Sequence, residues 1–139
     1  MFLENEFETI KFGKDFAKTL KGGEIICLKG NLGAGKTTLM KGVGEFFNIN
    51  ENEIISPTFT IINMYKTNKN NIKNIIHIDA YRIKDEDELL EFGVLEFFNK
   101  EDSLVFIEWP ENIEKYIIKN IKNINIEILE NNKRKITIN

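Results

Sequence analysis

The sequence predicts an α/β fold of three layers, built on a mixed sheet whose central strands are parallel. Three observations lead to this prediction. Apolar runs of strand length alternate with helical patterns in the first half of the chain. A glycine-rich segment connects one of these strands to the helix that follows it. Two further strand-like runs flank Asn131-Asn132 near the carboxy terminus, which favours a β-hairpin there.

Size and composition narrow the class of protein. The length of 139 residues fits a single domain, residues 1–139, because one core commonly organises roughly 100 to 200 residues. Hydrophobic residues make up 42% and charged residues 29%, which argues against disordered and membrane-spanning proteins. The net charge of -3 disfavours direct binding to RNA or DNA, which needs a clustered basic surface. The single cysteine, Cys27, lies in an apolar run and is expected in the core.

The first elements follow from periodicity. We expect a helix near residues 14–20, because apolar side chains recur there at helical spacing and Gly22-Gly23 end the pattern. An apolar strand is expected at residues 24–29. Residues 36–47 repeat a helical pattern, so the glycine-rich segment between strand and helix lies on a turn.

The second half of the chain predicts further strands and one short helix. Strands are expected at residues 58–65, 75–79 and 104–108, and a capped acidic helix at residues 85–92. The polar tract 66–74, rich in asparagine and lysine, predicts a solvated hairpin loop, with a basic binding patch as the alternative. Strands at residues 124–129 and 135–138 form the predicted carboxy-terminal hairpin.

Residues 30–38 (GNLGAGKTT), here called the phosphate segment, match the pattern G-x-x-x-x-G-K-[ST] at every fixed position. The glycines let the backbone turn tightly and point N–H groups at an anion, at the positive end of the following helix. Lys36 is expected to reach the β and γ phosphates, and the Thr37 hydroxyl to bind Mg²⁺. The predicted nucleotide-binding residues are Asn31, Leu32, Gly33, Ala34, Gly35, Lys36, Thr37 and Thr38. The alternative is a glycine-rich helix entry without a ligand.

This pattern predicts a P-loop NTPase-like fold that binds Mg-ATP. The chain contains no N-K-x-D sequence of the kind that reads guanine, so adenine is preferred.

Two acidic residues end apolar strands. Asp79 and Glu108 stand where neighbouring strands of this architecture reach the ligand edge, so they are the expected pair for metal binding and hydrolysis. The alternative for each is a solvated strand end. Trp109, directly after Glu108, either packs in the core or shields the acid from water. His77 alternates with isoleucines, which favours neutral packing over metal binding.

Residues 56–60 (SPTFT) follow the helix after the phosphate segment. P-loop proteins often place a loop here that senses the γ phosphate, and Thr58 would then complete the catalytic site. The alternative is a proline turn before an edge strand.

These blocks resemble the TsaE (YjeE) family in their order and spacing. The resemblance covers most of the chain and rests on residues 30–38 (GNLGAGKTT), 56–60 (SPTFT), 77–83 (HIDAYRI), 88–98 with an EFG core, and 107–111 (IEWPE). Two departures are that Asn31 stands where the family usually has an acid and Ala80 where it usually has a leucine.

The resemblance implies a small ATPase required for making threonylcarbamoyladenosine in tRNA. It implies that Lys36 and Thr37 bind phosphate and Mg²⁺, and that Glu108 also approaches the metal. Asp79, Trp109 and the Thr58 loop would support hydrolysis. It also implies TsaB and TsaD as partners, reset by ATP hydrolysis between modification cycles, with tRNA contacted only through that complex.

Arg134 has two interpretations, stacking near the adenine or an ordinary surface position. Two other functions would use the same phosphate segment to bind a nucleotide. One is a small-molecule P-loop kinase, and the other is a nucleotide-gated adaptor in which hydrolysis is incidental. Residues 1–6 lack the segments of a secretory signal, and no stretch approaches the ~18 apolar residues of a membrane span, so we expect a cytoplasmic protein.

Overall fold

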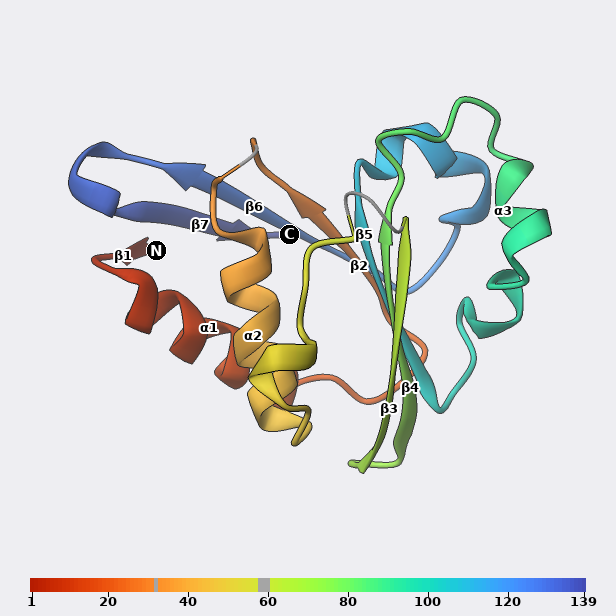
Figure 1. Ribbon diagram of the computed structural model, residues 1–139, viewed down its shortest axis with the longest axis horizontal. Helices are drawn as coiled ribbons and strands as arrows, with labels where there is room; N and C mark the ends of the chain where they lie inside the picture. Colours follow the sequence, from red (N-terminus) through yellow and green to blue (C-terminus); the bar gives the residue numbers. More distant parts are fainter. Residues whose placement is uncertain (32, 58–60) are drawn as a thin grey trace. The chain divides into compact units, whose positions relative to one another are not determined.

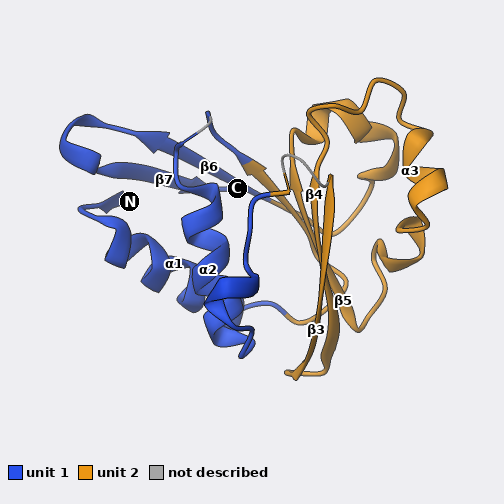
Figure 2. Ribbon diagram, in the orientation of Figure 1, with its two compact units in different colours: residues 1–20, 29–56, 123–139 blue, residues 21–28, 57–122 orange. Residues whose placement is uncertain are grey.

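The computed structural model describes residues 1–31, 33–57 and 61–139 (Figure 1). Leu32 and residues 58–60, which include the predicted site residue Thr58, lie outside the described residues. The chain divides into two compact units (Figure 2). Unit 1 comprises residues 1–20, 29–56 and 123–139, and unit 2 comprises residues 21–28 and 57–122. The single-domain organisation stays a prediction.

Two helices pack against each other in unit 1, α1 (Glu6–Lys18) and α2 (Lys36–Phe46). The first begins earlier than predicted because Asn5 caps it, its side chain accepting a hydrogen bond from the Glu8 backbone N–H at 2.9 Å. A short 3-10 helix, η1 (Glu51–Glu53), follows α2. The predicted helix at residues 36–47 is confirmed within a residue.

The strands of unit 1 are antiparallel. Strand β7 (Arg134–Ile138) pairs with β6 (Ile121–Ile128) on one side and with the short β1 (Phe2–Leu3) on the other. A 3-10 turn, η4 (Glu130–Asn132), connects β6 and β7, with Asn131 and Asn132 in the left-handed conformation that asparagine tolerates. The carboxy-terminal hairpin is therefore confirmed, whereas β1 was not predicted.

Unit 2 holds the parallel part of the sheet. Strand β5 (Ser103–Glu108) pairs in parallel with both β2 (Ile25–Lys29) and β4 (Ile72–Asp79), and β3 (Ile62–Lys69) adds antiparallel to β4. In this pairing Glu108 is the register partner of both Leu28 and Asp79. The predicted mixed sheet with parallel central strands is confirmed.

The predicted long loop at residues 66–74 is wrong in extent. Strand β3 continues to Lys69 and β4 starts at Ile72, leaving only Asn70 and Asn71 as the turn. Both asparagines have positive φ angles, 54° and 63°, which suits a two-residue turn between twisted strands. Polar composition masked the strands because most β3 side chains are not buried, so the tract lacks the apolar run that indicates a strand.

One face of the unit 2 sheet packs on helical segments. These are α3 (Glu88–Phe92) and the 3-10 helices η2 (Leu95–Phe97) and η3 (Pro110–Tyr116). The hydrophobic core between this face and the helical segments joins side chains from all of the parallel strands with Leu89, Val94 and Ile113. This core cluster contains Cys27, as predicted. Its strand members are Ile25, Cys27, Ile76, Ile78, Val105 and Ile107, and Ala80, directly after β4, also belongs to it. By strand alternation, His77, Asp79 and Glu108 occupy the opposite face.

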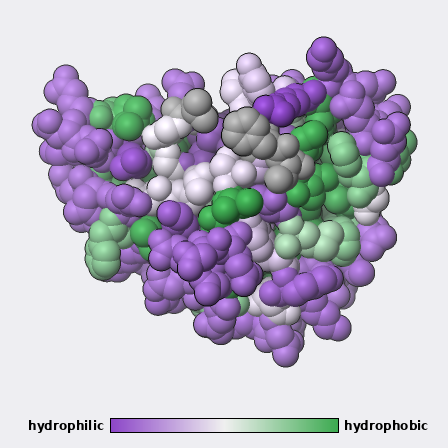
Figure 3. Space-filling view, in the orientation of Figure 1, coloured by the Kyte–Doolittle hydropathy of each residue, from purple (hydrophilic) through white to green (hydrophobic). Residues whose placement is uncertain are grey.

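The surface of unit 2 also exposes apolar side chains, as the green areas over that unit in Figure 3 show. Tyr81, Leu90, Phe92, Trp109 and Ile118 are the large exposed members in residues 81–118. Within the described part of the chain, no helix combines the length and apolar character required to cross a membrane.

Candidate functional site

The phosphate segment lies in unit 1, between the end of β2 and the first turn of α2. Gly35 is the N-cap residue of the helix, with φ 111°, and as a glycine it provides no side-chain cap. The first turn contains no acidic residue either. The positive end of the helix macrodipole is therefore not neutralised by a carboxylate of that turn, which favours an anion there.

Three glycines shape this segment, and two of them allow close packing. A Cβ on Gly30 would lie 2.7 Å from the Ile126 carbonyl oxygen, and one on Gly35 would lie 2.6 Å from Arg134 Nε. Gly33 is different, because it has φ 82° and nothing lies within 4 Å of where its Cβ would be. The backbone is thus closely packed at Gly30 and Gly35, whereas the space beside Gly33 is open to a ligand.

Lys36 folds back onto the segment. Its ammonium Nζ donates to the Gly30 carbonyl oxygen at 2.7 Å, and the residue is buried. A buried ammonium is stabilised by strong acceptors. This hydrogen bond therefore keeps the positive charge of Lys36 at the phosphate segment.

Arg134, at the start of β7, contacts the same segment. Its Nε donates to the Ala34 carbonyl oxygen at 2.9 Å, and its Nη1 donates to the Asn132 carbonyl oxygen at 3.0 Å. Arg134 therefore ties the hairpin to the phosphate segment, a role that sequence reasoning missed because the two residues are far apart along the chain. Stacking of Arg134 on an adenine stays a prediction.

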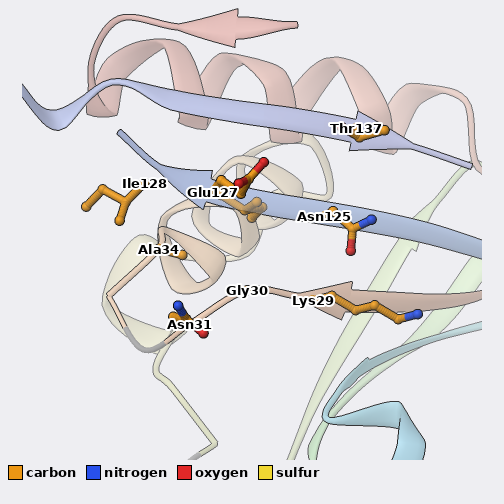
Figure 4. Close-up of a pocket in the computed structure, with 9 residues that line it drawn as sticks. Lys29, Gly30, Asn31, Ala34, Asn125, Glu127, Ile128 and Thr137 are labelled. Atoms are coloured by element: carbon orange, nitrogen blue, oxygen red, sulfur yellow. The ribbon is translucent and has the colours of Figure 1, made fainter. Parts of the chain in front are cut away.

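A cavity of about 450 Å³ lies beside the phosphate segment, entirely within unit 1 (Figure 4). Lys29, Gly30, Asn31 and Ala34 line one side, and strands β6 and β7 line the other. Its size is in the range of small-molecule pockets, roughly 300–1,000 Å³. Asn125, Glu127 and Thr137 contribute polar side chains that the sequence pattern had not indicated.

Asp79 and Glu108 end neighbouring strands in unit 2, and both are buried. Asp79 Oδ1 accepts a hydrogen bond from the Tyr81 backbone N–H at 3.0 Å, and Ala80 N–H donates to the Glu108 carbonyl oxygen at 3.0 Å. Their burial argues against solvated strand ends, the alternative interpretation of these acids. Lys29 follows Leu28, the register partner of Glu108, and leads directly into Gly30.

His77 is hydrogen-bonded to Glu108, which the sequence reasoning did not anticipate. Nε2 of the fully buried imidazole lies 2.8 Å from Glu108 Oε2, while no partner is found for His77 Nδ1 among the described residues. With Glu108 ionised, its carboxylate only accepts hydrogen bonds, and Nε2 is then the ring nitrogen that carries the hydrogen. With the other tautomer, the buried Nδ1–H would find no acceptor among the described residues, at a cost of about 1–3 kcal/mol.

Trp109 adopts a left-handed backbone conformation, φ 57° and ψ 52°, that is uncommon for an aromatic residue. Its ring centroid lies 5.0 Å from that of Tyr81, and the residue is 38% exposed. That exposure excludes ordinary core packing, one of the two interpretations of this residue. Shielding of a functional acid stays a prediction.

Ile61, the first described residue after residues 58–60, is bonded to Asp79. It too has a positive φ, 68°, which is an outlier for a β-branched side chain. Its N–H donates to the Pro57 carbonyl oxygen at 2.7 Å, and its own carbonyl oxygen accepts from the Asp79 N–H at 2.8 Å. Ile61, the residue that follows the SPTFT segment, is therefore anchored to the backbone of a predicted catalytic acid.

The predicted site residues fall into two groups. Unit 1 holds Asn31, Gly33 to Thr38 and Arg134, and unit 2 holds Asp79, Glu108 and Trp109. Over residues 1–31, 33–57 and 61–139, no group of three or more His, Cys, Asp or Glu residues is arranged to hold a metal ion. The metal set of Thr37, Glu108 and Asp79 stays a prediction.

Comparison with known proteins supplies the family context. The family model described as threonylcarbamoyl adenosine biosynthesis protein TsaE matches residues 3–136. The chain is 42% identical over 132 residues to the tRNA threonylcarbamoyladenosine biosynthesis protein TsaE of Rickettsia typhi, covering 95% of this chain and 88% of that one. It is 40% identical over 139 residues to the protein of that name from Aquifex aeolicus, covering 99% and 93%.

A crystal structure of Bacillus subtilis YdiB resembles the fold with a TM-score of 0.77 and 30% sequence identity. The match covers 99% of this chain and 82% of YdiB. The predicted P-loop type of α/β fold is confirmed by this likeness together with the strand and helix order.

Proposed function

The chain belongs to the TsaE family of threonylcarbamoyl adenosine biosynthesis proteins, and from this premise we propose that it binds and hydrolyses Mg-ATP. Hydrolysis then serves the threonylcarbamoyladenosine modification of tRNA. One observation carries the proposal: Gly33 and Gly35, both with positive φ, lead into a helix start without a side-chain cap, and Lys36 holds its charge there. A polyphosphate is the ligand class that this arrangement suits.

Mg²⁺ bound to the nucleotide would neutralise the charge that develops on the transferred phosphoryl group. The Thr37 hydroxyl and the carboxylates of Glu108 and Asp79 are hard oxygen ligands of the kind this ion prefers. Support comes from the strand register, because Glu108 is the partner of both Asp79 and Leu28, and Lys29 continues from Leu28 into the phosphate segment. We assign hydrolysis to this acid pair.

Trp109 and Thr58 are proposed to support hydrolysis rather than to bind the nucleotide. The strained, half-exposed Trp109 directly follows Glu108 and would limit access of water to that acid. Thr58 belongs to the SPTFT segment, and Ile61, the residue after that segment, is bonded to the Asp79 backbone. Asn31, Leu32, Gly33, Ala34, Gly35, Lys36 and Thr38 are proposed to surround the phosphates, with Arg134 securing the segment.

TsaB and TsaD are the proposed partners, and tRNA is proposed to be contacted only through their complex. The net charge of -3 supports the indirect role, since tight RNA binding needs clustered basic residues. A small-molecule kinase is less well supported. Such an enzyme usually closes several basic side chains over the phosphoryl group, and of the two arginines here Arg134 is engaged with Ala34.

Calorimetry with Mg-ATP tests the binding step. Lys36→Ala is expected to weaken binding about 10- to 100-fold, because a charge-assisted hydrogen bond contributes about 1.5–3 kcal/mol. Lys41→Ala is the matched control, because it removes the same charge from the same helix. Lys41 Nζ instead lies 3.8 Å from Glu51 Oε1, so this variant should bind Mg-ATP with the wild-type affinity. Failure of the wild-type chain to bind Mg-ATP would overturn the proposal.

Turnover tests the catalytic step. We expect feeble ATP hydrolysis by the isolated chain, a changed rate when TsaB and TsaD are added, and loss of both hydrolysis and tRNA modification in Glu108→Ala. If Glu108→Ala modified tRNA at the wild-type rate, Glu108 would have no part in the mechanism. If that variant lost hydrolysis but kept modification, the chain would instead act as an adaptor gated by nucleotide binding.

A further inference from the structure

We infer that His77 is the positioning residue of Glu108, holding its carboxylate in the orientation that hydrolysis requires. The inference rests on the proposed function, which makes Glu108 a catalytic acid. His77 is the one histidine in the sequence, so its effects are unusually easy to isolate.

The first support is geometric. His77 and Glu108 lie on adjacent parallel strands, where His77 is the register partner of Phe106 and Asp79 is that of Glu108. The side chains of His77 and Glu108 therefore share one face of the sheet and reach diagonally toward each other. Their hydrogen bond, 2.8 Å from Nε2 to Oε2, joins a fully buried ring to a glutamate side chain that is 5% exposed.

The second support is that this bond is the only hydrogen bond of the imidazole among the described residues. Nδ1 is buried and has no partner in residues 1–31, 33–57 and 61–139, so no second contact in that part of the chain explains why a polar ring is placed here rather than an apolar side chain. His77 is surrounded in sequence by Ile75, Ile76 and Ile78, all buried. A residue chosen only to fill this space would be apolar, which points to the bond with Glu108 as the reason for a histidine.

The third support is the position of Glu108 along the sheet. Glu108 is the register partner of Leu28 on β2, and the chain runs from Leu28 through Lys29 into the phosphate segment. A carboxylate that serves a nucleotide must present a fixed oxygen toward it, because positioning errors on the ångström scale slow catalysis. His77 is suited to fix it, in the way that an outer hydrogen-bond partner orients a metal-binding side chain.

Three variants distinguish positioning from packing. His77→Gln offers an amide N–H close to the place of Nε2, so it restores the bond to Glu108. His77→Asn offers its amide close to the place of Nδ1 instead, where the wild-type ring has no partner among the described residues. His77→Leu fills the space without any donor. If His77 only packs, His77→Leu should be the best tolerated of the three variants. If His77 positions Glu108, only His77→Gln should preserve its role.

We expect His77→Leu and His77→Asn to lower kcat for ATP about 10- to 100-fold, the usual effect of losing an outer partner of a catalytic group. The Kd for ATP should stay near the wild-type value, and the Mg²⁺ concentration for half-maximal turnover should rise. His77→Gln should recover most of kcat. Wild-type kcat and Mg²⁺ dependence in His77→Leu would overturn the inference.

A spectroscopic measurement on the protein without nucleotide gives an independent readout. Nitrogen-15 NMR of the single histidine should show the tautomer with hydrogen on Nε2, and Glu108→Gln should shift both ring nitrogen resonances. Glu111→Gln, a neighbouring acid outside this contact, should leave them unchanged. Unshifted resonances in Glu108→Gln would overturn the inference even if every His77 variant unfolded. Absence of ATP binding by the wild-type chain would instead overturn the proposed function.

Discussion

Trp109 places an aromatic side chain where the backbone favours glycine. Its φ of 57° puts it in the left-handed region, which costs an ordinary L-residue roughly 1–2 kcal/mol. The strain occurs beside Glu108, and strained backbone of this kind is concentrated at functional sites. The contact between the Trp109 and Tyr81 rings supplies part of the compensation.

We predict that Trp109→Gly is more stable than Trp109→Ala by about 1 kcal/mol, because glycine relieves the left-handed strain that alanine keeps. Both variants lose the indole ring, so the difference between their free energies of unfolding reports the backbone strain at residue 109 alone. Urea unfolding measures it. Equal midpoints would show that the conformation of residue 109 stores no strain. Both variants should hydrolyse ATP more slowly than the wild type if the indole shields Glu108.

Arg134 illustrates how one residue links sequence-distant parts of unit 1. We predict that Arg134→Ala lowers the free energy of unfolding by about 1 kcal/mol, the usual net contribution of a hydrogen bond, and weakens ATP binding as the phosphate segment loosens. Lys135→Ala, the next residue of β7, is the matched control. Differential scanning fluorimetry and calorimetry measure the two effects. Tighter ATP binding in Arg134→Ala would contradict a securing role.

At the scale of the element, α1 and α2 approach each other through glycines. A Cβ on Gly42 would collide with the Ile10 carbonyl oxygen, and one on Gly13 with the Leu39 carbonyl oxygen. Neither backbone atom moves easily. A Cβ on Gly44, in contrast, would meet the flexible end of the Ile54 side chain at 2.9 Å.

Alanine normally stabilises a helix interior over glycine by about 1 kcal/mol. We predict the reverse for Gly42→Ala, a loss of about 1–3 kcal/mol, because overpacking against fixed backbone forces the helices apart. Gly44→Ala in the same helix should cost much less, since a side chain can rotate away. Denaturant unfolding of the two variants provides the comparison. A Gly42→Ala variant as stable as the wild type would show that the helices tolerate wider spacing.

The start of α3 is tied to η3 by a surface cluster. Asp87 Oδ1 lies 2.8 Å from Lys115 Nζ and accepts from the Tyr116 hydroxyl at 2.5 Å. The hydrogen bond from Lys115, followed by that from Tyr116, lowers the pKa of Asp87. The hydrogen bond to Asp87 raises the pKa of Lys115, and likewise that of Tyr116.

These shifts determine how stability depends on pH. The lowered pKa of Asp87 means that its contribution is present above the unfolded value of 3.8 and is lost as pH falls through the folded pKa. The raised pKa values of Lys115 and Tyr116 mean that theirs are present below 10.5 and 10.0 and are lost as pH rises through the folded values. We predict that Asp87→Asn flattens both limbs of a plot of Tm against pH. High salt should shrink the difference, because the cluster is exposed. A variant curve parallel to the wild-type curve would contradict the linkage.

At the scale of the whole molecule, the sequence predicted the elements that depend on local pattern. The P-loop helix, the parallel strands and the carboxy-terminal hairpin follow from periodicity and glycine placement, and all three are present. The errors occur where one or two asparagines override a pattern. Asn5 caps α1 earlier than the apolar spacing indicated, and Asn70-Asn71 shorten a tract that composition alone described as a loop.

The candidate site was predicted less fully, for a physical reason. The phosphate segment is contiguous in sequence, so one pattern is enough to indicate its chemistry. The bonds from His77 to Glu108 and from Arg134 to Ala34 join residues brought together only by strand register and hairpin geometry. Periodicity identified His77 as buried but carried no information about which side chain would face it.

Binding of Mg-ATP should stabilise the folded chain by mass action. With free nucleotide at 100 times its Kd, the free energy of unfolding should rise by about 2.7 kcal/mol. Hydrogen exchange then shows which backbone is ordered. Amides of residues 30–38 should exchange more slowly when Mg-ATP is added, and so should those of Ala80, Tyr81 and Trp109 if Asp79 and Glu108 hold the metal.

The control for this experiment is ATP with a chelator in place of Mg²⁺. The phosphate segment should then keep part of its protection, because in the proposed complex its amides and Lys36 would contact phosphate directly, whereas the amides after Asp79 and Glu108 should lose theirs. If protection stayed confined to residues 30–38 even with Mg²⁺, the two acids would have no role in metal binding, and the catalytic carboxylates would have to be sought elsewhere in the chain.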